Sequence, residues 1–321
     1  MSSVAPHESH LSHPAALQAS LLDLIRRTSS DLPPDIRAAL QKGRDKEAKG
    51  SRALMALDTI DCNVDTAAAE HAPICQDTGM LKFYVHHPAG YDTLAFEEAA
   101  RAAVAEATAV GYLRQNSVDS ITGKNTGNNL GPGTPLFHFQ AWRRPDVDVR
   151  LMLKGGGCEN VGAQYSLPAE LKELGKKAGR DLEGVKLVIL DAIWRAQGKG
   201  CAPGYIGGCV GGDRASGLEV AKEQLLRVVG DTNPDPRLAE LEEECARIAN
   251  GLGVGPMGFG GDTTVLAVKI AARNRLPASF FVSVSYACWA HRRRGAVLDP
   301  ATHDIKTWLY DSADEALPEG H

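Results

Sequence analysis

Long apolar runs and an excess of one charge are both missing from this sequence. No stretch of about 18 consecutive apolar residues occurs, so the sequence predicts no transmembrane helix. The net charge over 321 residues is −5, with both signs interspersed, and we therefore do not expect nucleic acid or an anionic membrane as the main partner. With 43% apolar and 23% charged residues, the composition is that of an ordinary globular protein with a substantial core.

Paired-cysteine motifs are missing as well. Seven cysteines are scattered over the chain, at positions 62, 75, 158, 201, 209, 245 and 288, and none belongs to a CxxC motif. This spacing excludes a zinc ribbon and a thioredoxin-like motif. An odd number of scattered cysteines without an export signal also argues against a disulfide framework. We expect reduced thiols and a cytoplasmic location.

The first residues, "MSSVAPHESHLSHP", contain neither the basic nor the apolar segment of a secretory signal, and no arginine of a transit peptide. We expect residues 1–14 to be a disordered lead, residues 15–310 to form a single domain, and residues 311–321 to be a tail.

Apolar periodicity predicts both helices and strands. Spacings of three and four residues predict helices at 15–28, from about Asp35, and at 47–71, 93–111, 215–229 and 236–253. Alternating or β-rich runs predict strands at 80–87, 135–142, 148–154, 263–273 and 278–290. The apolar run at 186–197 fits either element. Because these elements lack a regular βαβ order, we expect an α+β fold with a mixed sheet and surrounding helices.

Glycines gather in four clusters, at 123–133, 155–157, 204–212 and 251–261. Such clusters are costly unless the chain needs positive φ angles or a close backbone approach to a ligand, so we expect loops that line a site with main-chain N–H groups. "GVGPMG" at 253–258 matches GxGxxG, but it follows a predicted helix rather than a strand. We therefore do not expect a dinucleotide site there.

Three cysteines border the glycine-rich segments. Cys75 opens "CQDTG", Cys201 lies in "GKGCAPGYIGG", and Cys288 ends a strand-like run at "ACWAHRRRG". Each lies where we expect a loop or a strand end, unlike Cys245 within its helix. Any one of them alone is equally explained as a small buried apolar residue.

Taken together and in order, "PICQDTG", "KNTGNN", "KGGGCEN", "GPMGFGGDTTVLAVKI" and "CWAHRRRG" resemble the alpha subunit, or N-terminal half, of the class I fumarase and L(+)-tartrate dehydratase family. The resemblance extends from about residue 15 to 300. It implies an oxygen-sensitive [4Fe-4S] hydro-lyase that reversibly dehydrates a small 2-hydroxy dicarboxylate, with glycine-rich loops around the cluster.

The resemblance implies that Cys75, Cys201 and Cys288 hold the cluster. The family usually has two prolines after the second cysteine, whereas this chain has "CAPG", with one proline lost. Cys158 is a rival ligand, because tartrate dehydratases share "GGGC"; we interpret it as a residue that lines the site. Three thiolates leave one iron without a protein ligand, and this iron can act as a Lewis acid on the substrate hydroxyl.

Further site residues follow from the same resemblance. Gln76, Asp77 and Arg114 match substrate-contacting positions, with Asp77 as the catalytic member that orients a base. Gly156 and Gly157 are implied to contact the other end of the dicarboxylate through their backbone. Three further polar residues are candidates for hydrogen bonds near the substrate: Asn125, Thr126 and Asn160.

Simpler explanations exist for several of these residues. Asp77 fits an Asx-turn or a helix cap, and Arg114 fits a helix-end arginine that interacts with the helix dipole. Lys154 adds positive charge near the site or is a solvated strand-end lysine. His291–Arg294 fits an interface or a buried ion-pair network better than a catalytic group.

A partner is implied as well. The family places the catalytic base and further substrate-binding residues in a beta subunit or C-terminal half, so we expect a heterotetramer or a larger dimeric assembly. "GGGC" and "CWAHRR" favour tartrate dehydratase, and "GGDTTVLAVKI" favours fumarase. L-tartrate, malate or fumarate, and methylated relatives therefore remain open as substrates.

A different class of function is also open. The chain could be a non-catalytic scaffold or regulatory subunit whose iron–sulfur cluster or zinc is only structural. Such a site has four protein ligands, so a fourth ligand such as Cys158 would favour this alternative.

Overall fold

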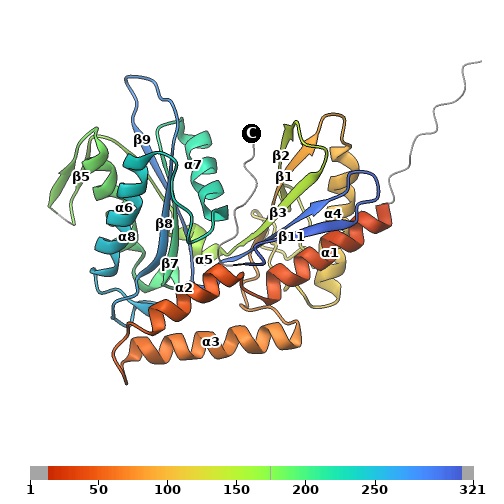
Figure 1. Cartoon of the computed structure of the whole chain (residues 1–321), viewed down its shortest axis with the longest axis horizontal. Coiled ribbons are helices and arrows are strands. Elements are labelled where there is room, and N and C mark those ends of the chain that lie inside the picture. Colours follow the sequence, from red (N-terminus) through yellow and green to blue (C-terminus); the bar gives the residue numbers. More distant parts are fainter. Residues whose placement is uncertain (1–13, 174, 313–321) are drawn as a thin grey trace, which may run out of the picture.

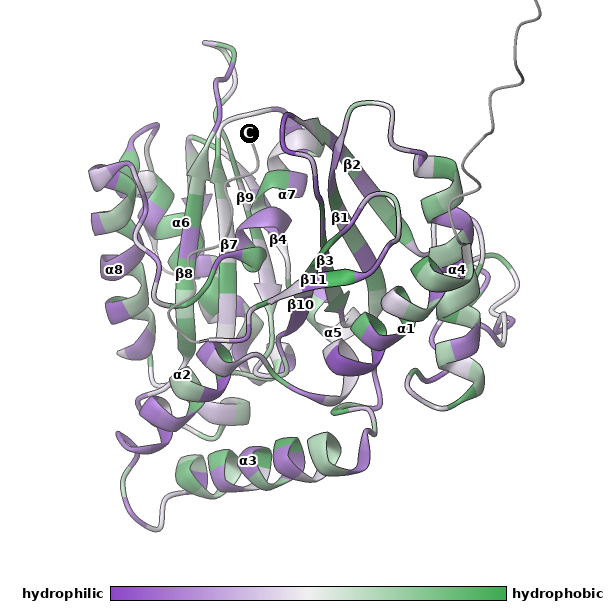
Figure 2. Cartoon of the chain, turned by 45° about the vertical axis from the view of Figure 1, so that its right-hand side comes forward, coloured by the Kyte–Doolittle hydropathy of each residue, from purple (hydrophilic) through white to green (hydrophobic). Residues whose placement is uncertain are grey.

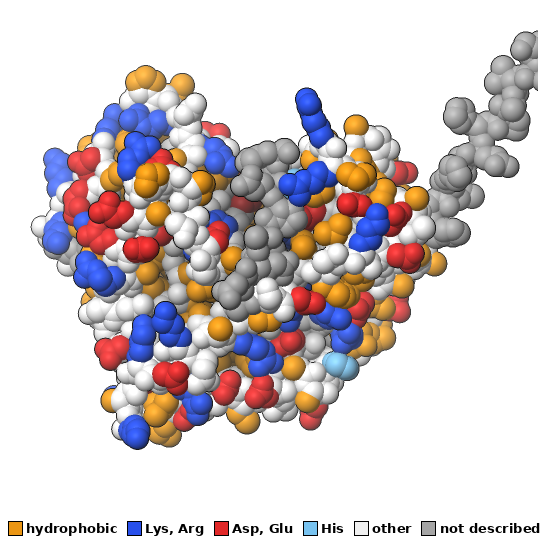
Figure 3. Space-filling model, viewed as in Figure 1, with side chains coloured by type: hydrophobic (Ala, Val, Ile, Leu, Met, Phe, Trp, Pro, Cys, Tyr) orange, Lys and Arg blue, Asp and Glu red, His pale blue; other side chains and the backbone are white. Residues whose placement is uncertain are grey.

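The computed structural model describes residues 14–173 and 175–312. The expected N-terminal lead and C-terminal tail lie outside these residues, apart from Pro14, Asp311 and Ser312. Within the described ranges, no helix is both long and apolar enough to cross a membrane. Lys, Arg, Asp and Glu side chains are interspersed over the face shown in Figure 3.

The first sheet has five strands in the order β11-β10-β3-β1-β2 (Figure 1). β1 and β2 are parallel, and the other neighbours are antiparallel. Helices α1 and α4 pack on one face and share a core with β1, β3 and β10. The bounds are α1 Pro14–Ser30, β1 Met80–Pro88, α4 Thr93–Ala109, β2 Leu136–Trp142, β3 Val147–Lys154, β10 Arg292–Leu298 and β11 Ile305–Leu309.

The second sheet has four strands in the order β4-β9-β7-β8, of which β7 and β8 are parallel. Helices α6 and α8 share a core with one face of this sheet, and α7 packs on the other face. The bounds are β4 Ala163–Ser166, α6 Leu182–Ala196, β7 Gly204–Val210, α7 Arg214–Glu223, α8 Pro236–Asn250, β8 Val265–Ala272 and β9 Phe281–Ala287. A small hairpin of β5 (Ala169–Leu171) and β6 (Lys176–Ala178) extends from this half.

Helices α2 (Pro34–Arg44) and α3 (Arg52–Glu70) lie beneath both sheets in Figure 1. Figure 2 shows hydrophobic and hydrophilic residues alternating along α3, which is the pattern of a helix with one buried face. That face contributes Leu57 and Ile60 to a core that also contains Tyr84 of the first sheet and Tyr205 of the second. One apolar cluster thus joins the two sheets at their base.

The mixed sheets and surrounding helices confirm the α+β prediction. The predicted helices are all present, and the ambiguous run at 186–197 is helix α6. The helix predicted from residue 47 begins only at Arg52, because the Ser51 side chain accepts a hydrogen bond from Leu54 N and caps it there. The alternating pattern of β1 predicts one solvent-exposed face, but Lys82 and Tyr84 on that face are buried like their neighbours.

The glycine cluster at 204–212 was wrongly expected to be a loop, because most of it forms the central strand β7. A Cβ on Gly204 would lie 2.4 Å from Cζ of Tyr286, and one on Gly207 would lie 2.0 Å from the carbonyl oxygen of Ala221. Glycine therefore serves here to admit a tyrosine ring and helix α7 close to the strand. The cluster at 155–157 likewise leads into a short helix, α5 (Gly156–Asn160), rather than a long loop.

The arginine-rich segment after Cys288 forms strand β10, which the sequence did not predict. Its arginines are buried, and Arg293 pairs with Asp35 while Arg294 pairs with Asp31. The expectation of a buried ion-pair network is thus confirmed for these two residues. The paired acids, Asp35 on α2 and Asp31 in the turn before it, allow arginines, which normally face water, to occupy an interior strand.

Candidate active site

Four cysteines from four separate segments meet where the two sheets approach each other. Cys75 lies between α3 and β1, Cys158 in α5, Cys201 before β7, and Cys288 directly after β9. A backbone hydrogen bond of 3.2 Å from Trp289 N to the carbonyl oxygen of Cys201 joins two of these segments. Burial raises the pKa of Cys201, and the negative charges of Cys158, Cys75 and Asp77 raise it further, so these groups lie close together.

Cys158 and Cys288 form a hydrogen-bonded pair of thiols. This contact lowers the pKa of Cys158 to about 7, with Lys154 helping its thiolate, and raises the pKa of Cys288 far above its usual value. The contact therefore favours the thiolate form of Cys158 and the protonated form of Cys288. A metal bound to Cys288 would displace that proton, because a coordinating thiol is deprotonated.

The Asp77 carboxylate joins three segments of the site. Its Oδ1 accepts hydrogen bonds from Gly79 N at 3.0 Å and from Asn116 Nδ2 at 3.1 Å, and its Oδ2 accepts one from Gly156 N at 2.7 Å. The contact with Gly79 is the Asx-turn that the sequence left open. The other two contacts fix the Asp77 carboxylate to the Arg114 loop and to α5, which an isolated turn would not do.

Asparagine side chains hold the loop that carries Arg114 through hydrogen bonds to its backbone. Asn129 Nδ2 donates to the Arg114 carbonyl oxygen at 2.7 Å, while its Oδ1 accepts from the backbone N–H groups of Asn116 and Ser117. Asn125 Nδ2 donates to the carbonyl oxygen of Gln115 at 2.8 Å. The "KNTGNN" segment thus positions the loop, and Thr126 takes part through its backbone N–H to the Ser117 carbonyl oxygen.

Exposed residues surround the cysteines. Gln76, Arg114, Gly156 and Gly157 are exposed, whereas Cys75, Cys201 and Cys288 are partly buried. Arg114 lies five residues beyond the end of α4, so it is not the helix-end arginine that the simpler explanation required. Asn160 is also exposed at the end of α5.

Lys154 is buried rather than a solvated strand-end lysine. Its Nζ donates to the carbonyl oxygen of Tyr286 at 2.6 Å and lies 3.0 Å from a Glu159 carboxylate oxygen. Together with Lys222, it lowers the pKa of Glu159 to about 2 despite burial, which acts in the opposite direction. Lys154 thus brings a fixed positive charge next to Cys158.

No three His, Cys, Asp or Glu side chains lie close enough to share one metal ion within residues 14–173 and 175–312. Each thiolate of a cubane cluster binds a different iron, so cluster ligands lie farther apart than the ligands of a single ion. The spacing of these cysteines therefore does not fit a mononuclear zinc site.

The sequence did not predict that Asn116 and Asn129 form hydrogen bonds at the site, or that Arg292 is buried without an acidic partner among the described residues. Asn116 and Asn129 act through loop contacts that no periodicity predicts, although Asn129 ends the quoted "KNTGNN" motif and Asn116 lies two residues after Arg114. The sequence contains no signal that singles out Arg292, because only the structure shows which arginine of "HRRRG" lacks an acidic partner among the described residues.

The family model described as fumarate hydratase (fumerase) matches residues 18–297. The chain belongs to the fumarate hydratase family. It is 50% identical over 299 residues to a provisionally named class I fumarate hydratase of Geobacillus stearothermophilus, covering 93% of this chain and 58% of that relative. The chain thus spans little more than half the length of this fumarate hydratase.

Two further relatives are closer in length to this chain. A provisionally named L(+)-tartrate dehydratase subunit alpha of Methanocaldococcus jannaschii is 32% identical over 278 residues, covering 85% of this chain and 94% of the relative. The L(+)-tartrate dehydratase subunit alpha of Escherichia coli strain K12 is 31% identical over 267 residues, covering 83% and 85%. The family resemblance inferred from the five motifs is thereby confirmed.

Proposed function

We propose that this chain carries the [4Fe-4S] cluster of a cytoplasmic hydro-lyase that reversibly dehydrates a small 2-hydroxy dicarboxylate. The observation that carries the proposal is the convergence of Cys75, Cys201 and Cys288 beside Asp77, under the exposed Arg114 loop. Membership of the fumarate hydratase family supports it.

The residues present fit an iron–sulfur cluster. Thiolates are the ligands that such clusters prefer, and the proposed ligands are Cys75, Cys201 and Cys288. The pocket also contains a buried guanidinium, Arg292, whose Nε and Nη1 have no hydrogen-bond partner among the residues described. An unpaired buried cation beside thiols favours an anionic group at this place.

When bound by three cysteines, the cluster would supply a Lewis acid through the iron that lacks a protein ligand. The chain's own residues would do the rest of the positioning. Arg114 would pair with a substrate carboxylate through two parallel hydrogen bonds. Gln76 and the Gly157 backbone N–H would bind the remaining polar groups. The Gly156 N–H is already donated to Asp77, so it would act through that carboxylate.

Asp77 would orient the base that removes a proton from the carbon next to the hydroxyl-bearing carbon. Its three hydrogen bonds hold the carboxylate in one orientation, and this suits a group that positions another. We propose that the base itself comes from a beta subunit or a second half of the enzyme, which would cover the exposed residues around the cysteines. The names of the tartrate dehydratase relatives as alpha subunits support such a heteromeric assembly.

A structural metal site is the second candidate, and one observation favours it. Cys158 lies against Cys288 and would be the fourth protein ligand of a closed cluster. Because two thiols in hydrogen-bond contact are too close to bind different corners of one cube, we prefer Cys158 as a neighbour of the ligand rather than a ligand.

Anaerobic reconstitution of the full chain, produced together with its partner subunit, tests the proposed function. We expect a visible iron–sulfur absorbance that disappears in air together with hydratase activity, assayed in parallel with L-tartrate, D-tartrate, malate, fumarate and mesaconate. Bound zinc without iron, or a cluster that survives Cys75→Ser unchanged, would contradict the proposal.

A further inference from the structure

Arg292 is a buried cation without an acidic partner in the part of the chain that the structure describes. Its side chain is 1% exposed, and its Nε and Nη1 atoms have no hydrogen-bond partner there. Guanidinium groups stay charged at any pH at which proteins fold, so burial cannot be relieved by loss of a proton. A buried charge of this kind normally has a paired anion.

The two following arginines of the same strand provide the comparison. Arg293 pairs with Asp35 and also donates to the Arg227 carbonyl oxygen at 2.9 Å. Arg294 pairs with Asp31 at 3.0 Å and donates to two backbone carbonyl oxygens. Each also leaves some nitrogens unpaired, but each has a carboxylate to balance its charge. Burial on β10 therefore does not by itself explain the isolation of Arg292.

Arg292 points toward the cysteine pocket. A Cβ placed on Gly155 would lie 3.1 Å from Asp77 Oδ2 and 3.8 Å from Arg292 Nη2, so the guanidinium reaches the turn before α5. Beside the larger effects of their mutual contact and burial, the charge of Arg292 acts to lower the pKa of both Cys158 and Cys288. The Asp77 carboxylate, which lies beside the same turn, already accepts hydrogen bonds from three N–H donors.

We propose that Arg292 is the counter-charge of the iron–sulfur cluster and donates hydrogen bonds to its sulfur atoms. The inference rests on the proposed function, because it needs a cluster in the pocket. A [4Fe-4S]²⁺ core held by three thiolates carries one net negative charge, and reduction adds another. A fully buried guanidinium suits such a resident anion better than a substrate carboxylate, which would reach the exposed Arg114 instead.

The experiment compares three variants of the anaerobically reconstituted full chain: Arg292→Gln, Arg292→Lys and, as matched control, Arg294→Gln. The readouts are iron and sulfide content, the midpoint potential of the cluster from a redox titration followed by electron paramagnetic resonance, and the Tm of the cluster-free chain. We expect Arg292→Gln to shift the potential downward, since the reduced cluster loses its counter-charge, and to lower cluster content. Arg292→Lys keeps the charge and should restore much of both.

The cluster-free Tm separates this role from a structural one. Arg292→Gln should leave that Tm unchanged or raise it, whereas Arg294→Gln should lower it and leave the cluster potential unchanged. If the wild-type chain takes up no cluster, the proposed function itself is contradicted. A loaded Arg292→Gln variant with wild-type potential and cluster content, or one whose cluster-free Tm falls as far as that of Arg294→Gln, would overturn only this inference.

Discussion

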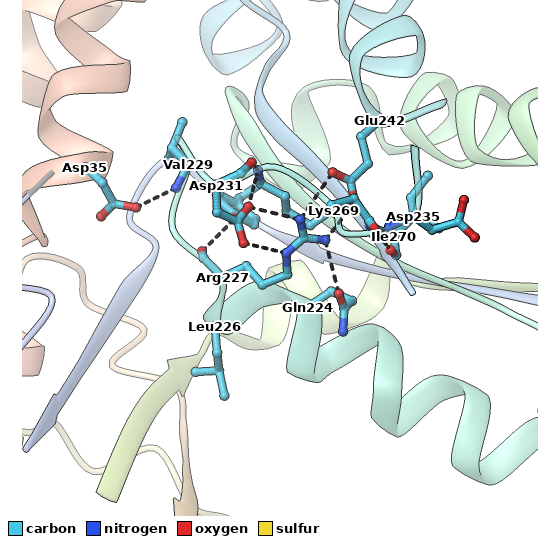
Figure 4. Close-up of polar contacts among 12 residues, drawn as sticks. Asp35, Gln224, Leu226, Arg227, Val229, Asp231, Asp235, Glu242, Lys269 and Ile270 are labelled. Carbon is cyan, nitrogen blue, oxygen red and sulfur yellow. Dashed lines mark hydrogen bonds and ion pairs between the residues drawn. The ribbon is translucent and has the colours of Figure 1, made fainter. Parts of the chain in front are cut away.

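Two regions of the molecule bury charges in opposite ways. Behind the second sheet, Arg227 donates to Asp231 and to Glu242, and Lys269 also pairs with Asp231 (Figure 4). Glu242 Oε1 further accepts hydrogen bonds from Asn233 Nδ2 and from Ile270 N. In the cysteine pocket, by contrast, Arg292 is more deeply buried than Arg227 but has no carboxylate of its own among the described residues.

The difference distinguishes charges that stabilise the fold, which are paired within the chain, from a buried charge that is left for a ligand. Every charged side chain of the Arg227 network has a partner of opposite charge within the chain, so the network joins the segment 227–233 to α8 and β8 without a ligand. The pocket gathers four thiols and a buried guanidinium that has no acidic partner among the described residues. Unpaired buried groups of this kind indicate where a ligand belongs.

The largest effect is expected from the proposed ligands. Single substitutions Cys75→Ser, Cys201→Ser and Cys288→Ser should each abolish the stable visible cluster absorbance of the anaerobic chain, because serine is a poor ligand for this cluster. Cys158→Ser is the matched control and should retain the cluster. Loss of the cluster in Cys158→Ser as well as in the other three would favour the closed structural site with four protein ligands.

The paired network should respond in stability rather than in cluster binding. Glu242→Ala leaves Arg227 and the Ile270 N–H without their buried acceptor, and removing one partner of a buried pair costs about 3–5 kcal/mol. Urea unfolding of the cluster-free chain measures this loss. The folded fraction should still take up the cluster, and a stability within error of wild type would show that the network is not needed for the fold.

Lys82 of β1 offers a test by pH. Burial, together with the charges of Lys222 and Lys154, lowers its pKa to about 8, against an unfolded value near 10.4. As the pH increases, Lys82 therefore loses its proton in the folded chain before it does so in the unfolded chain. The free energy of unfolding consequently rises between about pH 8 and pH 10.4. Lys82→Met should be the more stable chain at pH 7 by roughly 1–3 kcal/mol, and the difference should close toward pH 10. A constant difference across this range would contradict the assigned cause.

The smallest expected effect is that of Asp77→Asn on stability. The amide keeps one acceptor oxygen, but its NH₂ group must face an N–H donor, so we expect a loss of about 1–2 kcal/mol in the free energy of unfolding. Turnover by the complex with the partner should fall far more than stability does. Wild-type turnover would exclude Asp77 from the proposed positioning of the base.

Much of the fold follows from periodicity in the sequence, and two of the strands that it did not predict, β7 and β10, share a physical reason. β7 contains three glycines, which are poor strand formers because they leave no side chain to pack, and β10 begins with three arginines. In both, tertiary contacts override local preference. Close approach by α7 and Tyr286 requires glycine in β7, and Asp35 of α2 and Asp31 of the turn before it pair with the arginines of β10.

The site was predicted unevenly for a similar reason. The motifs around Cys75, Cys201 and Cys288 identify a family, and the family suggests roles for them. The support from Asn129 and the isolation of Arg292 depend on which distant side chains arrive nearby. No local pattern at "NNLG" or "HRRRG" shows whether a partner lies 15 residues away or across the sheet.

The central claim is that three thiols hold a cluster and one iron remains without a protein ligand. Mössbauer spectroscopy of the anaerobic chain reconstituted with ⁵⁷Fe tests this most directly. We predict three similar irons and one distinct iron whose signal shifts when a dicarboxylate substrate is added to the complex with the partner. Four irons with thiolate-like signals that do not respond to substrate would contradict the account.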